Sequence, residues 1–287
     1  MTWIVFASGS AFFAGITAIL AKIGIRNLNS TLATALRTIV VLVSSWLMVL
    51  VAGSLGDIRD ISGRTLFFLV LSGLATGASW LCYFRALQLG DVSRVAPIDK
   101  SSTVLAILLA WIFLSEPAGM PQILGIAGIG TGTLLMTGRK KSAAGQSGGR
   151  QWIIFAFLSA LSASLTSLLG KIGVENVESN LATAIRTVVV LAMAWMMVFF
   201  TGAQKDMSDI SRKNGIFLFL SGLTTGLSWL CYYRALQDGP ASVVVPIDKL
   251  SILVTIVFSR LALKEKPGRR ALAGLALLLA GTIAMLF

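Results

Sequence analysis

The chain has 287 residues, of which 56% are hydrophobic and only 13% are charged. Soluble domains carry about 25% charged residues, so this composition indicates a membrane protein without a soluble domain. The net charge of +12 does not indicate nucleic-acid binding, because the basic residues lie in short loops and inside apolar stretches. The sequence has no histidine, which excludes His-ligated metals and His proton relays, and we expect no metal and no cofactor.

Ten apolar stretches follow one another along the chain. A hydrocarbon core of about 30 Å needs about 20 residues per helix. The predicted spans are 3–24, 31–53, 65–89, 93–114 and 120–138, then 152–174, 180–201, 214–238, 242–263 and 270–287. The predicted fold class is therefore an all-α polytopic membrane protein with ten transmembrane helices. Cys82 and Cys231 fall inside two of the spans and are expected to be packing residues rather than a disulfide or a metal pair.

The chain also repeats itself. Residues 3–138 align without a gap with residues 152–287 at a fixed offset of 149 residues. Each copy holds five spans, so the second copy enters the membrane upside down, and inverted repeats around a midplane site are typical of secondary transporters. We assign residues 1–138 to a first five-helix repeat, 139–151 to a flexible linker, and 152–287 to a second, inverted repeat.

Loop charges predict the orientation, because cytoplasmic loops carry an excess of Lys and Arg. The loops that join spans 1–2, 3–4, 5–6, 7–8 and 9–10 hold twelve cations, whereas the opposite side holds Arg59 and Arg64. We therefore expect both termini to be extracytoplasmic and the linker to be cytosolic, in a protein of the cytoplasmic (inner) membrane.

Each copy places five ionisable residues inside its spans. They are Lys22, Arg37, Arg85, Asp99 and Lys100, and one repeat later Lys171, Arg186, Arg234, Asp248 and Lys249. An unpaired charge at the bilayer centre costs about 2.5–3.5 kcal/mol, so we expect these groups to face the interior and to be paired. Their depth gathers the first set in a layer toward the cytosol and the second in a layer toward the outside. Three roles are open for these layers. They act as two gates, in which each aspartate bridges to arginines of its own copy, they form static ion pairs, or they contact the substrate directly.

A polar face lies between the two layers on the third span of each copy. It consists of Ser72, Thr76, Ser79, Trp80 and Tyr83, and of Ser221, Thr225, Ser228, Trp229 and Tyr232. The hydroxyl residues recur at i, i+4, i+7 and i+11, which is one side of a helix. This face either lines a substrate cavity or holds helices together. Pro97 and Pro246 each precede an aspartate by two residues, which predicts a flexible, water-accessible start of spans 4 and 9.

Taken together, the chain resembles EamA-type members of the drug/metabolite transporter superfamily along both copies. The resemblance rests on Ala-x-x-x-Arg in span 2 and its repeat, on Y-F-R-A-L and Y-Y-R-A-L closing spans 3 and 8, on Glu116 and Glu265, and on the Gly-rich spans 5 and 10. It implies a cavity built from spans 1–4 and 6–9, with spans 5 and 10 peripheral. Members move small metabolites, usually as exporters or proton-coupled carriers. Their termini are usually drawn in the cytosol, which the loop charges here oppose.

We therefore expect a secondary active transporter that works by alternating access on a small polar or amphiphilic organic metabolite. The excess of cations in each layer favours a substrate with a carboxylate or phosphate. A flippase for a phosphorylated lipid carrier, a passive channel and a purely structural membrane protein are the alternatives. The expected partners are the small-molecule substrate and membrane lipid, with a coupling proton as a further candidate, in a monomer or homodimer. No nucleophile–base pair indicates an enzyme, and the chain has no P-loop for ATP-driven transport.

Overall fold

The structure is a computed structural model. It describes residues 2–25, 28–89, 95, 98, 101–117, 119–136, 151–263 and 268–287. These residues form α-helices and two short 3-10 segments, with no strand among them. Seven helical segments are long and apolar enough to cross a membrane, and three shorter apolar helices coincide with the remaining predicted spans. The prediction of an all-α polytopic membrane protein is confirmed.

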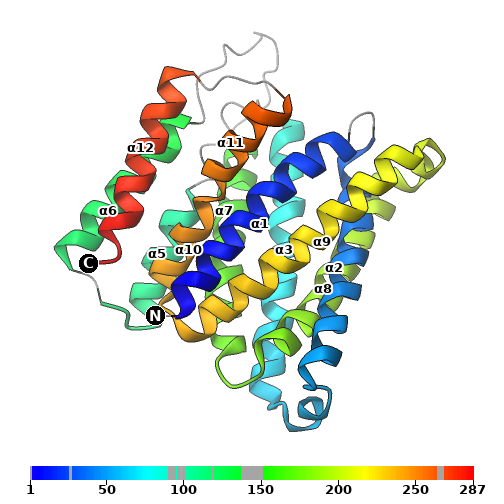
Figure 1. The fold of residues 1–287 in the computed structure, drawn as a ribbon, viewed down its shortest axis with the longest axis horizontal. Helices are drawn as coiled ribbons and strands as arrows, with labels where there is room; N and C mark the ends of the chain where they lie inside the picture. Colours follow the sequence, from blue (N-terminus) through cyan, green and yellow to red (C-terminus); the bar gives the residue numbers. More distant parts are fainter. Residues whose placement is uncertain are drawn as a thin grey trace. The chain divides into compact units, whose positions relative to one another are not determined.

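The helices follow the predicted spans closely (Figure 1). In the first repeat they are α1 (Thr2–Gly24), α2 (Ser30–Ala52), η1 (Gly56–Asp60), α3 (Gly63–Leu89), α5 (Ser102–Phe113) and α6 (Met120–Met136). In the second repeat they are α7 (Gln151–Val174), α8 (Ser179–Thr201), η2 (Ala203–Asp209), α9 (Arg212–Asp238), α10 (Ala241–Lys249), α11 (Ser251–Leu263) and α12 (Arg269–Ala284).

The second helix of each repeat ends in the same way. The C-cap glycines Gly53 and Gly202 are equivalent residues, and they have φ values of 74° and 72°. Glycine adopts this left-handed conformation without steric cost, and it commonly ends helices. The sequence duplication therefore extends to the backbone conformation of the turns.

Span 9 is divided into α10 and α11. Pro246 lies inside α10, and the helix ends at Lys249 before Leu250. Proline has no N–H to donate to the preceding turn, yet α10 continues through Pro246 and the break follows it at Leu250. The predicted flexible, water-accessible start of span 9 stays a prediction.

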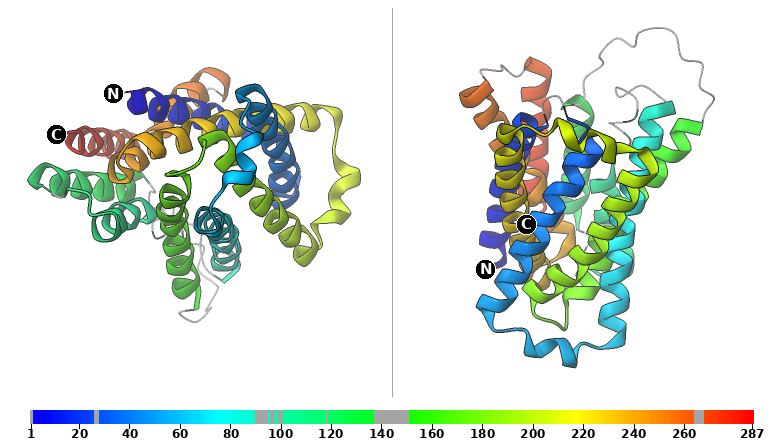
Figure 2. Two further views of the ribbon diagram at one scale, coloured as in Figure 1. Left: turned by 90° about the horizontal axis from the view of Figure 1, so that it is seen from below. Right: turned by 90° about the vertical axis from the view of Figure 1, so that its right-hand side faces the viewer.

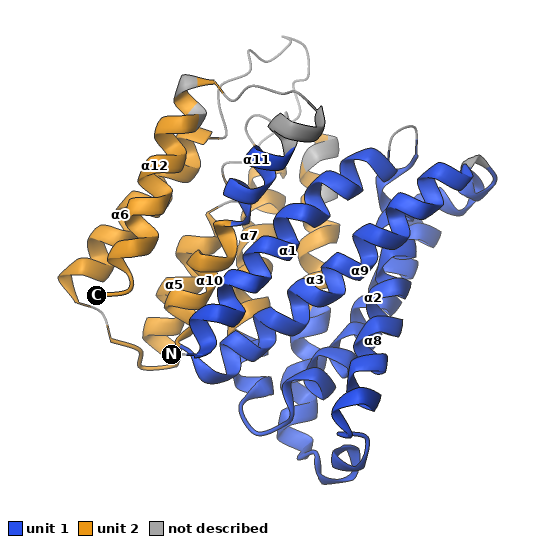
Figure 3. Ribbon diagram, in the orientation of Figure 1, with its two compact units in different colours: residues 1–74, 169–239, 251–265 blue, residues 75–168, 240–250, 266–287 orange. Residues whose placement is uncertain are grey.

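The described helices form two compact units (Figure 3). Unit 1 comprises residues 1–74, 169–239 and 251–265, and unit 2 comprises residues 75–168, 240–250 and 266–287. Each unit takes helices from both repeats, and α3 and α7 contribute residues to both units. The compact units therefore cut across the sequence repeats.

In unit 1, the first helix of one repeat packs along the third helix of the other. α1 contacts α9 over its length, and α2 contacts α8 and α9. Three hydrogen-bonded pairs give the direction of the α1–α9 packing: Ser10 with Ser228, Thr17 with Thr224, and Gly24 with Asn214. The residue numbers rise on α1 as they fall on α9, so the two helices are antiparallel. If both repeats had the same orientation in the membrane, the first helix of one would run parallel to the third helix of the other. The antiparallel pairing therefore supports an inverted second copy.

In unit 2, the last helices of the two repeats lie side by side (Figures 1 and 2). α6 and α12 meet through glycines: a Cβ added to Gly132 would lie 2.5 Å from the carbonyl oxygen of Gly274. Small residues allow such close backbone approach where lipid provides no hydrophobic drive for association. The unit also brings α5 against α10.

Candidate functional site

Arg186 on α8 is enclosed within unit 1. Its side chain is buried, with a relative exposure of 2%, and its Nε donates a hydrogen bond to the Ser72 hydroxyl at 3.0 Å. The guanidinium carbon lies 5.1 Å from the centroid of the Trp229 ring and 4.9 Å from that of the Tyr233 ring. A desolvated cation–π contact of this kind contributes about 2 kcal/mol. Two aromatic rings and a hydroxyl thus stabilise this intramembrane cation.

Of the two rings at Arg186, Trp229 belongs to the predicted polar face, whereas Tyr233 is the neighbour of the predicted Tyr232. The two tyrosine rings meet edge to face, with centroids 5.3 Å apart. Tyr233 is buried, while Tyr232 is half-buried. The i, i+4, i+7 pattern defines a helix face, but it does not fix which of two adjacent aromatic residues meets a charge on another helix.

Lys171 on α7 binds the end of α9. Its Nζ donates to the carbonyl oxygens of Leu236, Gln237 and Gly239, at 2.5, 3.3 and 2.9 Å. A cation at a helix C-terminus satisfies free carbonyls and complements the helix dipole. In return, the Gln237 side chain donates to the carbonyl oxygens of Val174, the last residue of α7, and of Val177 after it, at 2.9 and 2.7 Å. The ends of α7 and α9 are therefore joined by reciprocal caps.

The remaining cations of the second repeat lie closer to solvent. Arg234 pairs with Asp238 at 3.1 Å, and the two side chains have relative exposures of 44% and 31%. The i, i+4 spacing of this pair was visible in the sequence, but Asp238 was not among the predicted residues. Asp248 lies 3.7 Å from its neighbour Lys249. A bridge from Asp248 to Arg186 or Arg234 would join the two units and stays a prediction.

In the first repeat, Arg37 on α2 donates from Nη2 to the Thr225 hydroxyl at 2.9 Å. Lys22 and Arg85 are exposed. Asp99 and Lys100 lie outside the described residues. The structure thus brings Arg186 and Arg37 into contact with the polar face of the other repeat, Arg186 through Ser72 and Arg37 through Thr225.

Most hydroxyls of the predicted polar face bind other helices. Ser228 donates to the Ser10 carbonyl oxygen at 3.1 Å, and the equivalent Ser79 donates to that of Ser159 at the same distance. Thr76 lies 3.3 Å from the Thr166 hydroxyl. Trp80 and Tyr83 are half-buried. These contacts favour the interpretation that the face holds helices together, and its role as a cavity lining stays a prediction.

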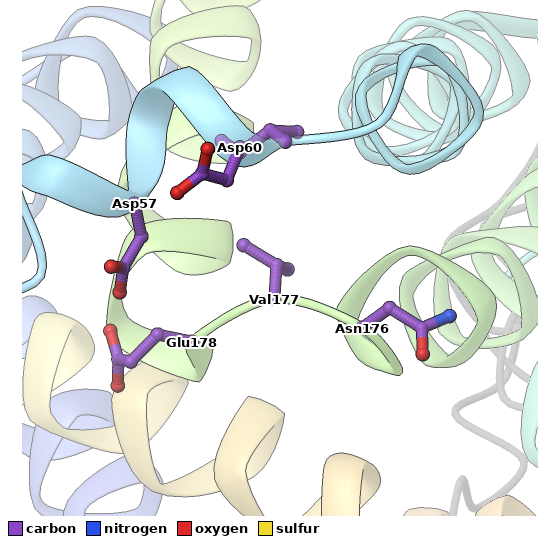
Figure 4. A pocket seen from close by; sticks show the side chains of 6 residues that line it. Asp57, Asp60, Asn176, Val177 and Glu178 are labelled. Carbon is purple, nitrogen blue, oxygen red and sulfur yellow. The ribbon is translucent and has the colours of Figure 1, made fainter.

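A small acidic pocket in unit 1 was not predicted (Figure 4). It has a volume of about 230 Å³ and is lined by Asp57, Asp60, Ile61, Asn176, Val177 and Glu178. The Glu178 carboxylate is already occupied, because it accepts hydrogen bonds from the Ser54 hydroxyl, the Asn180 amide and the Leu181 N–H, at 3.0, 2.8 and 2.9 Å. Within the described residues, no group of three His, Cys, Asp or Glu side chains could hold a metal ion.

Known proteins resemble the chain throughout. The EamA-like transporter family matches residues 1–138 and 150–287. A protein from Sinorhizobium sp, described as "Uncharacterized transporter in cobO 3'region", is 47% identical over 135 residues, which are 47% of this chain and 96% of that protein. The "Uncharacterized transporter YxxF" of Bacillus subtilis (strain 168) is 26% identical over 217 residues, which are 74% of this chain and 68% of that protein. The Sinorhizobium relative is about as long as one repeat.

The fold also occurs in a solved structure, described only as "Crystal structure of protein". The TM-score is 0.76 at 15% identity, and the match covers 99% of this chain and 96% of the other. At this identity the likeness concerns the fold alone.

Proposed function

The chain belongs to the EamA-like transporter family, and we propose that it is a secondary active transporter that works by alternating access. It is a multi-pass membrane protein. The proposed substrate is a small polar or amphiphilic organic metabolite with a carboxylate or phosphate group. It would be exported along its own gradient or carried with protons.

The observation that carries this proposal is a difference between two equivalent arginine–serine pairs. Arg186 binds Ser72 through Nε at 3.0 Å. The offset of 149 residues makes Arg37 and Ser221 the equivalent pair. Here the buried Nε of Arg37 and the buried hydroxyl oxygen of Ser221 have no hydrogen-bond partner among the described residues. The same contact is formed in one repeat and open in the other, which is the asymmetry that alternating access gives to inverted repeats.

We infer that the two pairs exchange during transport. Formation of the Arg37–Ser221 bond would accompany loss of the Arg186–Ser72 bond, so that each pair closes one side in turn. Within the described residues, buried guanidinium nitrogens that lack an acceptor occur at both arginines, Nε of Arg37 and Nη1 of Arg186. Such a donor is costly, so both arginines favour a ligand that accepts hydrogen bonds. Carboxylates and phosphates are the strongest such acceptors for a guanidinium group. This supports an anionic substrate.

The proposal is tested by counterflow in liposomes. A panel of carboxylated and phosphorylated metabolites is first screened by thermal shift, and labelled forms of the hits are used for uptake. A carrier takes up label faster when the liposomes are preloaded with unlabelled compound, whereas a channel shows no such acceleration. We expect Arg37→Gln and Arg186→Gln to abolish counterflow. Arg59→Gln, at an exposed residue of η1, is the matched control and should retain it.

Proton coupling is tested separately at Asp99 and Asp248. If the coupling proton binds these carboxylates, Asp99→Asn and Asp248→Asn still exchange substrate but lose accumulation driven by a pH gradient. Accumulation that persists in both variants excludes these carboxylates as the coupling site.

A further inference from the structure

Helix α10 begins without a cap of its own. The residue at its N-cap position is Pro240, which makes no side-chain hydrogen bond to the helix. By contrast, α2, α8 and α9 are capped locally by Asn29, Glu178 and Ser211. The first N–H groups of a helix have no partner within it and need one from elsewhere.

The missing cap comes from the other repeat. Glu116, which follows α5, accepts a hydrogen bond from the Ala241 N–H on Oε1 at 2.6 Å and one from the Ser242 N–H on Oε2 at 2.8 Å. Both carboxylate oxygens are therefore used on the first turn of α10. Negative charge at this end of a helix is also favoured by the helix dipole. All of these residues belong to unit 2.

The backbone before Glu116 is adapted to this contact. Ser115 has a φ of 53°, and among the described residues it is the one non-glycine with a positive φ. Such strained residues persist where surrounding contacts hold them. The unusual turn at Ser115 ends α5 and directs Glu116 to α10.

We propose that Glu116 is a positioning residue that fixes α10 to the end of α5 across the repeat boundary. α10 carries Asp248 and Lys249 at its far end, and α11 after the break at Leu250 belongs to unit 1 with α1. The cap keeps the first half of span 9 with α5 in unit 2, whereas the second half of the span, α11, belongs to unit 1.

The first experiment measures exposure of the α10 start. Ser242→Cys and Ser179→Cys, both at buried residues in the first turn of a helix, are introduced singly after Cys82 and Cys231 are replaced by alanine. Labelling by a membrane-impermeant maleimide is then compared. Glu116→Gln should raise the labelling rate at position 242 at least fivefold and leave position 179 unchanged. Glu175→Gln, at an exposed glutamate, is the matched control and should change neither.

The second experiment separates capping from positioning. Pro240→Asp places a local cap on α10 and, combined with Glu116→Gln, should restore protection at position 242. Spin labels at Ile112 on α5 and Lys249 on α10 report the relation of the two helices. Their distance distribution should be narrow in the parent, broad in Glu116→Gln, and still broad in the double variant, because a local cap does not connect α10 to α5.

Four results would overturn the proposal: unchanged labelling at position 242, an equal rise at both probes, no protection by Pro240→Asp, or a narrow distribution in the double variant. Neither readout uses a substrate. Both experiments therefore test the role of Glu116 even if the transport assay finds no substrate.

Discussion

Arg186 and Arg37 occupy equivalent positions in the two repeats, yet their surroundings differ. Arg186 is enclosed by two aromatic rings and bound to Ser72. Arg37 is only half-buried, and its Nε does not reach Ser221 among the described contacts. The residue types of the two arginine–serine pairs are the same. The residues around them differ, because Phe84 is the equivalent of Tyr233.

The lysines show the same contrast. Lys171 binds three carbonyl oxygens at the end of α9, whereas the equivalent Lys22 is exposed. Under the predicted orientation, the layer of Lys171 and Arg186 faces the outside. Among the described residues, Lys171 and Arg186 are thus less exposed than Lys22 and Arg37.

The largest effect is expected at the arginines. Arg186→Lys removes the stacking on two rings and the directed hydrogen bond to Ser72, and it should lower the free energy of unfolding by about 3 kcal/mol. Arg37→Lys keeps a cation able to reach Thr225 and should cost less than about 1 kcal/mol. Unfolding in detergent measures both. Equal losses would mean that the two layers are equally packed.

The lysines come next. Lys171→Met leaves the C-terminal carbonyls of α9 without their charged donor and should cost about 2 kcal/mol. Lys213→Met, at an exposed residue of α9, is the control and should change the free energy of unfolding by no more than about 0.5 kcal/mol. The same unfolding assay compares them, and a loss at Lys213 as large as at Lys171 would show that the carbonyl contacts of Lys171 do not stabilise the fold.

A small residue sharpens the comparison further. A Cβ added to Gly170 would lie 2.8 Å from Cε1 of Tyr233, whereas the equivalent residue of the first repeat is already Ala21. Gly170→Ala should therefore displace the tyrosine from Arg186 and cost about 1.5 kcal/mol. Tyrosine fluorescence is masked by tryptophan, so the check is a double-mutant cycle. The unfolding free energies of Gly170→Ala, of Arg186→Lys and of the double variant are measured and compared. Additive losses would show that the alanine acts elsewhere.

The smallest effect is expected at Ser54. Its hydroxyl donates to Glu178 at 3.0 Å, and the equivalent residue of the other repeat is Ala203. Ser54→Ala should cost about 1 kcal/mol. In the first repeat, the residue equivalent to Glu178 is Asn29, which offers no carboxylate. The variant Ala203→Ser should therefore bring no matching gain in the free energy of unfolding. A gain of about 1 kcal/mol there would contradict this account of the difference.

Much of the fold could be predicted from the sequence. Bilayer thickness sets the length of an apolar span, so α1, α2 and α3 begin and end within two residues of their predicted bounds. These bounds depend on local sequence. The break in span 9 does not follow from Pro246 in the same way, because α10 continues through the proline and ends at Lys249.

The candidate site could be predicted only in part. The sequence identified Arg186 and Lys171, but their partners depend on how helices rotate and slide against one another. A one-residue difference in that rotation exchanges Tyr232 for Tyr233, and the acceptors of Lys171 are backbone carbonyls that carry no sequence signal. The cap from Glu116 is equally hidden, because the two partners are 125 and 126 residues apart.

The central claim is that the two repeats are inverted, with their charged layers on opposite sides of the membrane. Gly56 and Lys205 are equivalent, exposed residues on η1 and η2, so a single cysteine at each reports the side of its repeat. After Cys82 and Cys231 are replaced, Gly56→Cys should react with an impermeant maleimide added outside intact cells. Lys205→Cys should react only after the membrane is permeabilised. Labelling of both variants from the same side would contradict the account.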